Sequence, residues 1–168
     1  MIPRELIDTA QVPDGEELRL YRHGTDFMIV LDRNELMSTR QRGSEEALAT
    51  MVVARIAKTP RPHVLVGGYG MGFTLRAALA ALPADALVTV AEVLPDIIEW
   101  ARGPMAEVAA GCLDDPRVHL IVGDVVKVIE RSPETFDAIL LDVDNGPDGL
   151  VRPDNNRLYS RQIGRAHV

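Results

Sequence analysis

Three glycines and three acidic residues are spaced through the middle of the chain in a pattern that suits nucleotide chemistry. The glycines are Gly68, Gly70 and Gly72, and the acids are Glu92, Asp124 and Asp142. The glycines follow an apolar run, and each acid ends a further one, as expected at the ends of buried strands. A glycine turn between a strand and a helix lets a ligand approach bare backbone and the helix N-terminus. The ends of parallel strands meet at one edge of a sheet, where ligands bind.

The acids offer complementary contacts to an adenosine. A carboxylate at Glu92 can accept two hydrogen bonds from a ribose diol, and one at Asp124 can accept an adenine amino proton. Asp142 would lie beside the reacting centre, with Asp144 on the loop that follows. The order G-x-G-x-G disfavours NAD, because Phe73 stands where the dinucleotide fingerprint has its third glycine. We therefore predict a site for an adenosine-containing sulfonium.

A purely structural interpretation of each residue stays open at this point. The glycines could serve only a tight turn, and each acid could be a solvated loop residue or a helix cap, Asp124 in particular. The succession of three acids after one glycine turn is what favours a binding site. The four histidines are scattered without metal-ligand spacing, so no metal site is predicted.

The residues in this pattern need a framework of alternating strands and helices to position them. The runs HVLVGG, ALVTVAEV, RVHLIVGD and FDAILLDVD are typical of buried strands, and helix-like segments separate them. We therefore predict an α/β fold with a Rossmann-like parallel sheet of the class I methyltransferase type, covered by helices on both faces. Only strands 1–4 of such a sheet can be found, so the sheet is expected to be incomplete.

The N-terminal part shows a different periodicity. Apolar residues alternate on both sides of the turn-like HGTD, which predicts a small β-hairpin, and RNELMSTRQRG follows as a polar connection. A helix is then expected with Ser44 as its N-cap. Its predicted apolar face consists of Ala47, Leu48, Met51, Val52 and Ile56.

From about residue 28 to residue 162 the chain resembles the spermidine synthase family, within the class I S-adenosylmethionine-dependent transferase fold. The resemblance is carried by GSEEALA, VLVGGYGMG, AEV, LDDPRVHLIVGD, FDAILLDVDNGP and LYS. It implies transfer of an aminopropyl group from decarboxylated S-adenosylmethionine to an amine acceptor. Carried over, the glycine turn, Glu92 and Asp124 bind the nucleoside, while Asp142 and Asp144 orient the amine and receive its proton.

The chain departs from the family pattern where the family handles the amine. The family sequence G-G-G-D-G-G has an aspartate that contacts the aminopropyl amine, and this chain has Gly70 there. The family's catalytic loop Asp-x-x-Asp-Pro becomes DVDNGPDG. Two alternatives therefore stay open: a methyltransferase that uses S-adenosylmethionine, and a nucleotide-binding protein without turnover. The sequence fixes neither the acceptor, nor the form of the donor, nor the oligomeric state, although relatives commonly form oligomers.

Composition narrows the class of protein. The net charge is −7, and the single cysteine excludes an internal disulfide. No Lys/Arg run, signal-peptide-like apolar core or membrane-length apolar stretch is found. We expect a cytoplasmic protein that binds a small cationic amine rather than nucleic acid or a membrane.

The predicted organisation has three parts. Residues 1–42 are the N-terminal hairpin segment, residues 43–162 the nucleotide-binding α/β domain, and residues 163–168 a non-native tail. The tail IGRAHV is the peptide that a common sequencing adapter encodes. We therefore expect an N-terminal fragment of a longer protein, inactive by itself.

Overall fold

The computed structural model describes residues 3–12, 16–132 and 135–142, which contain two four-stranded sheets. The first sheet is antiparallel, with its strands in chain order. Its strands are β1 (Glu5–Gln11), β2 (Glu17–His23), β3 (Asp26–Leu31) and β4 (Asn34–Ser38).

The predicted hairpin is the centre of this first sheet. It corresponds to β2 and β3, which pair from Leu18↔Leu31 to His23↔Asp26. The prediction of a polar connection after it was wrong in part, because β4 lies within that segment and pairs with β3. The strand β1 was missed because ELIDTAQ is exposed at most of its positions, so it lacks the alternation of a half-buried strand.

The second sheet is parallel and confirms the predicted α/β framework. Its strands are β5 (His63–Gly67), β6 (Leu87–Glu92), β7 (Val118–Val122) and β8 (Ala138–Leu141). The spatial order is β7-β6-β5-β8, so the chain reverses direction across the sheet between β5 and β8. Ligands in such sheets bind beyond the carboxyl ends of the strands at this reversal.

Helices cover both faces of the parallel sheet, as predicted. They are α1 (Gly43–Arg55), α2 (Phe73–Ala81), α3 (Pro95–Arg102), α4 (Ala106–Ala109) and α5 (Val125–Arg131), with a 3-10 turn, η1 (Cys112–Asp114). Side chains alternate along β5: Val64 and Val66 join the larger hydrophobic cluster, while Leu65 packs with α5 on the opposite face. The expected interruption after α3 is present at Gly103.

The orientation of α1 differs from the prediction. The helix begins at Gly43, and no side chain caps it, so Ser44 is not its N-cap. Its buried residues are Ala49 and Val53, whereas Leu48 is 41% exposed and Met51 is 62% exposed. The helix contacts α2 and β8, and its most buried side chain is the small one of Ala49. The predicted face is therefore wrong for Ala47, Leu48 and Met51, which are exposed, and right for Val52 and Ile56, which pack against the core.

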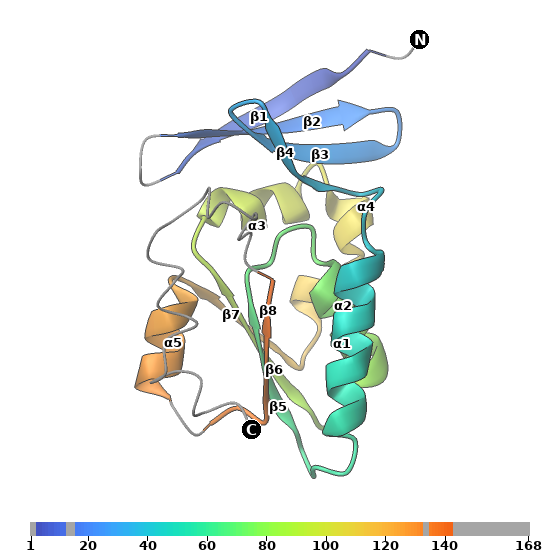
Figure 1. Ribbon diagram of the computed structural model, residues 1–168, viewed down its shortest axis with the longest axis vertical. Coiled ribbons are helices and arrows are strands. Elements are labelled where there is room, and N and C mark those ends of the chain that lie inside the picture. Colours follow the sequence, from blue (N-terminus) through green and yellow to red (C-terminus); the bar gives the residue numbers. More distant parts are fainter. Residues whose placement is uncertain (1–2, 13–15, 133–134, 143–168) are drawn as a thin grey trace.

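The N-terminal sheet lies across the carboxyl ends of the parallel strands, at the top of Figure 1. Its inward side chains, among them Leu20 and Ile29, belong to the same hydrophobic cluster as Val64 of β5 and Trp100 of α3. The buried indole of Trp100 also donates a hydrogen bond from Nε1 to Asp8 of β1, at 2.8 Å. The two sheets thus share one core.

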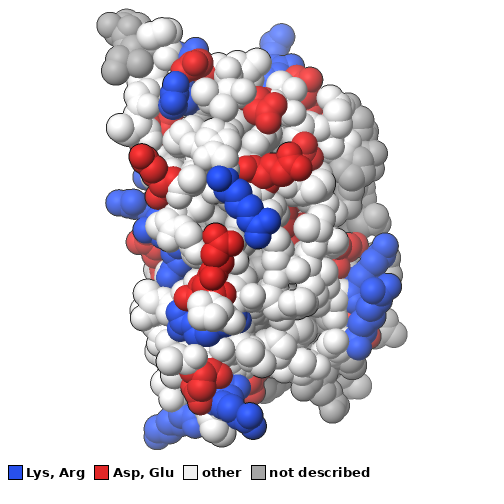
Figure 2. All heavy atoms as spheres, turned by 180° about the vertical axis from the view of Figure 1, so that it is seen from behind, with Lys and Arg blue, Asp and Glu red and all other residues white. Residues whose placement is uncertain are grey.

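The surface carries charges of both signs. Basic and acidic side chains are interspersed over the face shown in Figure 2.

Candidate functional site

The fold brings the three glycines and the three acids Glu92, Asp124 and Asp142 to one edge of the parallel sheet, where its strands end. Gly68, Gly70 and Gly72 form the turn between β5 and α2, with φ of 84°, 55° and 82°. Glu92 is the last residue of β6, and Asp142 follows the last residue of β8. Because β6 and β8 flank β5, these residues surround the carboxyl end of the central strand.

Asp124 lies at the same edge of the sheet, because the residue before it, Gly123, donates from its backbone N–H to the carbonyl oxygen of Glu92 at 2.7 Å. Asp124 follows β7 and is the N-cap of α5, where its Oδ1 accepts from the Val126 amide at 2.8 Å. Asp124 is therefore a helix cap, which is one of the two roles that the sequence allowed. The contact of Asp124 with adenine stays a prediction. Asp144 lies outside the described residues, as do the expected tail and the loop after Asp142.

Glu92 fastens the glycine turn to β6. The residue is 7% exposed, and its carboxylate accepts from two backbone amides, Tyr69 N to Oε2 at 2.8 Å and Leu94 N to Oε1 at 2.9 Å. Burial raises the pKa of this carboxyl, and the backbone N–H groups oppose that rise. A buried carboxylate held in this way has a fixed position beside the turn, which suits recognition of a diol.

Asp142 is held by a residue that the sequence analysis missed. Its Oδ2 accepts from the hydroxyl of Thr74 in the first turn of α2, at 2.8 Å, and its backbone N–H donates to Gly67 at 2.8 Å. Burial raises the pKa of the Asp142 carboxyl, while the bond from Thr74 lowers it. A threonine just inside a helix that follows a glycine turn is the signal that could have indicated this partner.

Gly70 and Gly72 are needed for space as well as for their positive φ, because other side chains occupy the place that a Cβ would take. A Cβ on Gly72 would lie 2.6 Å from the hydroxyl oxygen of Tyr69, whose ring is buried under the turn. A Cβ on Gly70 would lie 2.9 Å from Sδ of Met37, a residue of β4. Neither Tyr69 nor Met37 was predicted to contribute to the site. Tyr69 could have been noticed, because an aromatic residue interrupts the glycines.

The buried thiol of Cys112 stabilises Tyr69 and shows no feature of a nucleophile. The Tyr69 hydroxyl and Cys112 Sγ are 3.5 Å apart. Burial raises the pKa of the thiol, and burial with the neighbouring Cys112 raises the pKa of the tyrosine. Both groups are therefore neutral at physiological pH, and they act as a packing contact between the glycine turn and η1.

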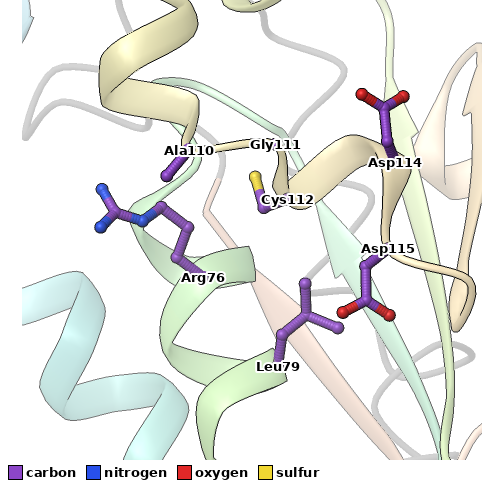
Figure 3. A pocket seen from close by; sticks show the side chains of 7 residues that line it. All are labelled: Arg76, Leu79, Ala110, Gly111, Cys112, Asp114 and Asp115. Carbon is purple, nitrogen blue, oxygen red and sulfur yellow. The ribbon is translucent and has the colours of Figure 1, made fainter.

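A surface pocket lies away from this edge, between α2 and the segment from α4 to η1 (Figure 3). It contains none of the predicted site residues. Its polar side chains already have partners within the chain: Arg76 with Val108 O, Cys112 with Tyr69, Asp114 with Arg102 and Asp115 with Arg117. We therefore do not assign the chemistry to this pocket.

Within residues 3–12, 16–132 and 135–142, no group of three or more His, Cys, Asp or Glu side chains could hold a metal ion. In the same part of the chain, no helix has the length and apolar character needed to cross a membrane.

Known proteins share both the sequence pattern and the fold. The spermine/spermidine synthase domain matches residues 43–166. A polyamine aminopropyltransferase of Mycobacterium tuberculosis is 33% identical over 151 residues, which cover 88% of this chain and 27% of that protein. A polyamine aminopropyltransferase of Thermococcus onnurineus is 31% identical over 168 residues, which cover 91% of this chain and 58% of that protein.

Solved structures agree at the level of the fold. The spermidine synthase of Thermotoga maritima superposes with a TM-score of 0.71 at 22% identity, covering 96% of this chain and 52% of that chain. A spermidine synthase in complex with the transition state analogue AdoDATO gives a TM-score of 0.70 at 21% identity, covering 96% of this chain and 51% of that one. The chain thus spans about half the length of these structures. With a domain match over most of its residues and this fold, the chain belongs to the spermine/spermidine synthase domain family.

Proposed function

We propose that this chain forms the donor-binding part of an aminopropyltransferase that acts on an amine acceptor. In this proposal Glu92 holds the ribose, the turn from Gly68 to Gly72 lies under the donor, and Asp142 faces the acceptor. Asp124 contributes to the adenine site through the oxygen that its capping bond leaves free. The observation that carries the proposal is the buried Glu92 carboxylate, fixed by two backbone amides at the edge where the sheet reverses.

The apolar surroundings at the same edge support a nucleoside ligand. Val93 follows Glu92, and Val122 ends β7, and both are exposed although they are large apolar residues. Exposed valines at the ends of β6 and β7 offer an apolar surface to a base, while the neighbouring Glu92 offers hydrogen bonds to the sugar.

The chemistry asks little of the protein beyond positioning. The nitrogen lone pair of the acceptor forms a bond to the carbon next to the sulfonium, while the carbon–sulfur bond breaks and its electrons neutralise the sulfur. The acceptor nitrogen must be deprotonated, and a carboxylate near it can take that proton. Asp142, with its pKa raised by burial, is suited to this role, and Asp144 is proposed to share it.

A methyltransferase is a second candidate, and Gly70 is the observation that favours it. The position has no side chain, and so it presents no carboxylate to an aminopropyl ammonium. Comparing S-adenosylmethionine with its decarboxylated form in binding measurements separates the two activities, because an aminopropyltransferase prefers the decarboxylated donor.

The test of the proposed site is a calorimetric titration of the chain with 5′-methylthioadenosine. Glu92→Gln should weaken binding roughly tenfold or more, because a charged acceptor of hydrogen bonds is lost. Glu99→Gln, at an exposed position on α3, is the matched control and should bind as the wild type does. Unchanged affinity in a folded Glu92→Gln variant would remove Glu92 from the site and contradict the proposal.

A further inference from the structure

The side chain of Met37 lies directly over Gly70. Gly70 is buried with φ of 55°, and a Cβ built on it would lie 2.9 Å from Sδ and 3.3 Å from Cε of Met37. Met37 pairs with Ile29 within the N-terminal sheet. The thioether of one sheet therefore covers the glycine turn of the other, in the space that a side chain at residue 70 would need.

The position of this contact follows the path that a donor would take. Glu92 ends β6, Asp142 follows β8, and β5 lies between these two strands. A donor with its ribose at Glu92 and its reactive carbon toward Asp142 must cross the carboxyl end of β5. The glycine turn and Met37 lie at that end, so the group attached to the donor sulfur passes beside them.

The two acids that flank this contact each accept hydrogen bonds from the protein. The Glu92 carboxylate accepts from the amides of Tyr69 and Leu94, and the Asp142 carboxylate accepts from Thr74. Among the described residues, the group directly over Gly70 is the Met37 thioether, and residue 70 itself supplies only backbone. A thioether is soft, polarisable and uncharged, so it contacts an alkyl chain well and gives an ammonium no counter-charge.

We propose that Met37 and Gly70 together determine which donor the site accepts, and that they select by shape and apolar contact instead of charge. This inference rests on the proposed function and specifies its donor. The chain binds adenosyl sulfonium compounds with an uncharged alkyl tail as tightly as those whose tail carries an ammonium.

A matched pair of ligands tests the inference by calorimetry on the 168-residue chain. One ligand is decarboxylated S-adenosylmethionine, and the other is the methyl propyl sulfonium of adenosine, in which hydrogen replaces the terminal ammonium. The wild type should bind the two within about threefold of each other. Met37→Ala should weaken both to the same degree, while Met51→Ala, at an exposed position on α1, should change neither.

A double variant supplies the missing charge without the steric conflict. Gly70→Asp alone brings a Cβ against the Met37 sulfur, whereas Met37→Ala combined with Gly70→Asp leaves room, and aspartate tolerates a positive φ. The double variant should prefer the ammonium-bearing ligand by roughly tenfold or more, the effect of a charge-assisted hydrogen bond.

Two results would overturn the inference while leaving the proposed function intact. One is a wild type that already prefers the ammonium-bearing ligand by about tenfold. The other is a folded double variant that gains no such preference. A folded wild type that binds neither ligand, nor 5′-methylthioadenosine, would overturn the proposed function and this inference with it, so the two failures are distinguishable.

Discussion

At the scale of single residues, the buried acids of the site have protonation equilibria that differ from those of solvated carboxyls. Burial is the largest cause at both Glu92 and Asp142, and it raises the pKa of each. The opposing hydrogen bonds come from backbone amides at Glu92 and from the Thr74 hydroxyl at Asp142. The two acids therefore call for different experiments. The pH dependence of nucleoside binding tests Glu92, and removal of the Thr74 hydroxyl tests Asp142.

Nucleoside binding should weaken as pH falls, and it should do so above the ordinary glutamate pKa. Ribose recognition requires the Glu92 carboxylate, and the pKa of this group is raised above 4.5, so protonation begins at a higher pH than usual. Because the pKa is raised in the folded state, the contribution of Glu92 to stability has the opposite trend, and it is lost as pH rises through that value. Calorimetric titrations with 5′-methylthioadenosine between about pH 4 and 8 would measure the dependence. The same dependence in Glu92→Gln would contradict the assignment to this residue.

Thr74 is expected to position Asp142 and to tune its proton affinity. Thr74→Val removes the 2.8 Å hydrogen bond to Asp142 Oδ2 while it keeps the branched shape, so the pKa of Asp142 should rise further. The reason is that one hydrogen bond to a charged group contributes about 1.5–3 kcal/mol, and Thr74→Val removes it. Titration of the Asp142 carboxyl carbon by NMR would measure the rise in pKa, with Thr74→Ser as the control that restores the bond. An unchanged pKa in Thr74→Val would show that the contact has no such effect.

At the scale of elements, the glycine turn is held in place by packing as well as by its backbone conformation. Gly72 has φ of 82°, and the Tyr69 ring fills the space on its side-chain side. Tyr69 in turn contacts Cys112 of η1, so the turn is fixed from β6 through Glu92 and from η1 through Tyr69. A ligand bound here would therefore meet a rigid backbone.

Gly72→Ala should destabilise the fold by about 2–4 kcal/mol. The change combines a left-handed backbone conformation, which costs an L-residue about 1–2 kcal/mol, with overpacking against Tyr69. The matched control is Gly43→Ala at the start of α1, where a Cβ meets nothing within 4 Å, and which should be neutral or slightly stabilising. Urea denaturation followed by circular dichroism measures both variants. Equal stabilities for the two would show that Tyr69 yields without cost.

The sequence was sufficient for the elements with strong periodicity and insufficient where packing decides. The parallel strands were predicted because burial on both faces requires continuous apolar runs, as in Val64–Val66. The strand β4 was missed because NELMS does not alternate between exposed and buried positions. The face of α1 was wrong for Leu48 and Met51, because the buried positions of this helix are Ala49 and Val53. Met37 and Thr74 were also missed, because their contacts with Gly70 and Asp142 are formed only in the folded chain.

At the scale of the whole molecule, the N-terminal sheet is part of the framework of the site. It lies over the carboxyl ends of the parallel strands (Figure 1), and Met37 brings it into contact with the glycine turn. The hydrogen bond from Trp100 Nε1 to Asp8 joins its first strand to α3. Displacing this sheet would therefore uncover the donor path, even though its residues lie far from Glu92 and Asp142 in the sequence.

Asp8→Ala should loosen this connection and lower the thermal midpoint by about 2–4 °C at neutral pH, because the buried indole N–H loses its acceptor. Asp8→Asn keeps an acceptor oxygen and should stay closer to the wild type. Trp100 is the single tryptophan, so melts followed by its fluorescence report on this contact directly. The hydrogen bond lowers the pKa of Asp8 below 3.8, so the stabilisation is present above that pH and is lost as pH falls through the lowered value. The difference between the wild type and Asp8→Ala should therefore shrink below about pH 3.8. If Asp8→Ala and Asp8→Asn melt alike at neutral pH, the bond does not stabilise the attachment of β1 to α3, and apolar contacts hold the N-terminal sheet.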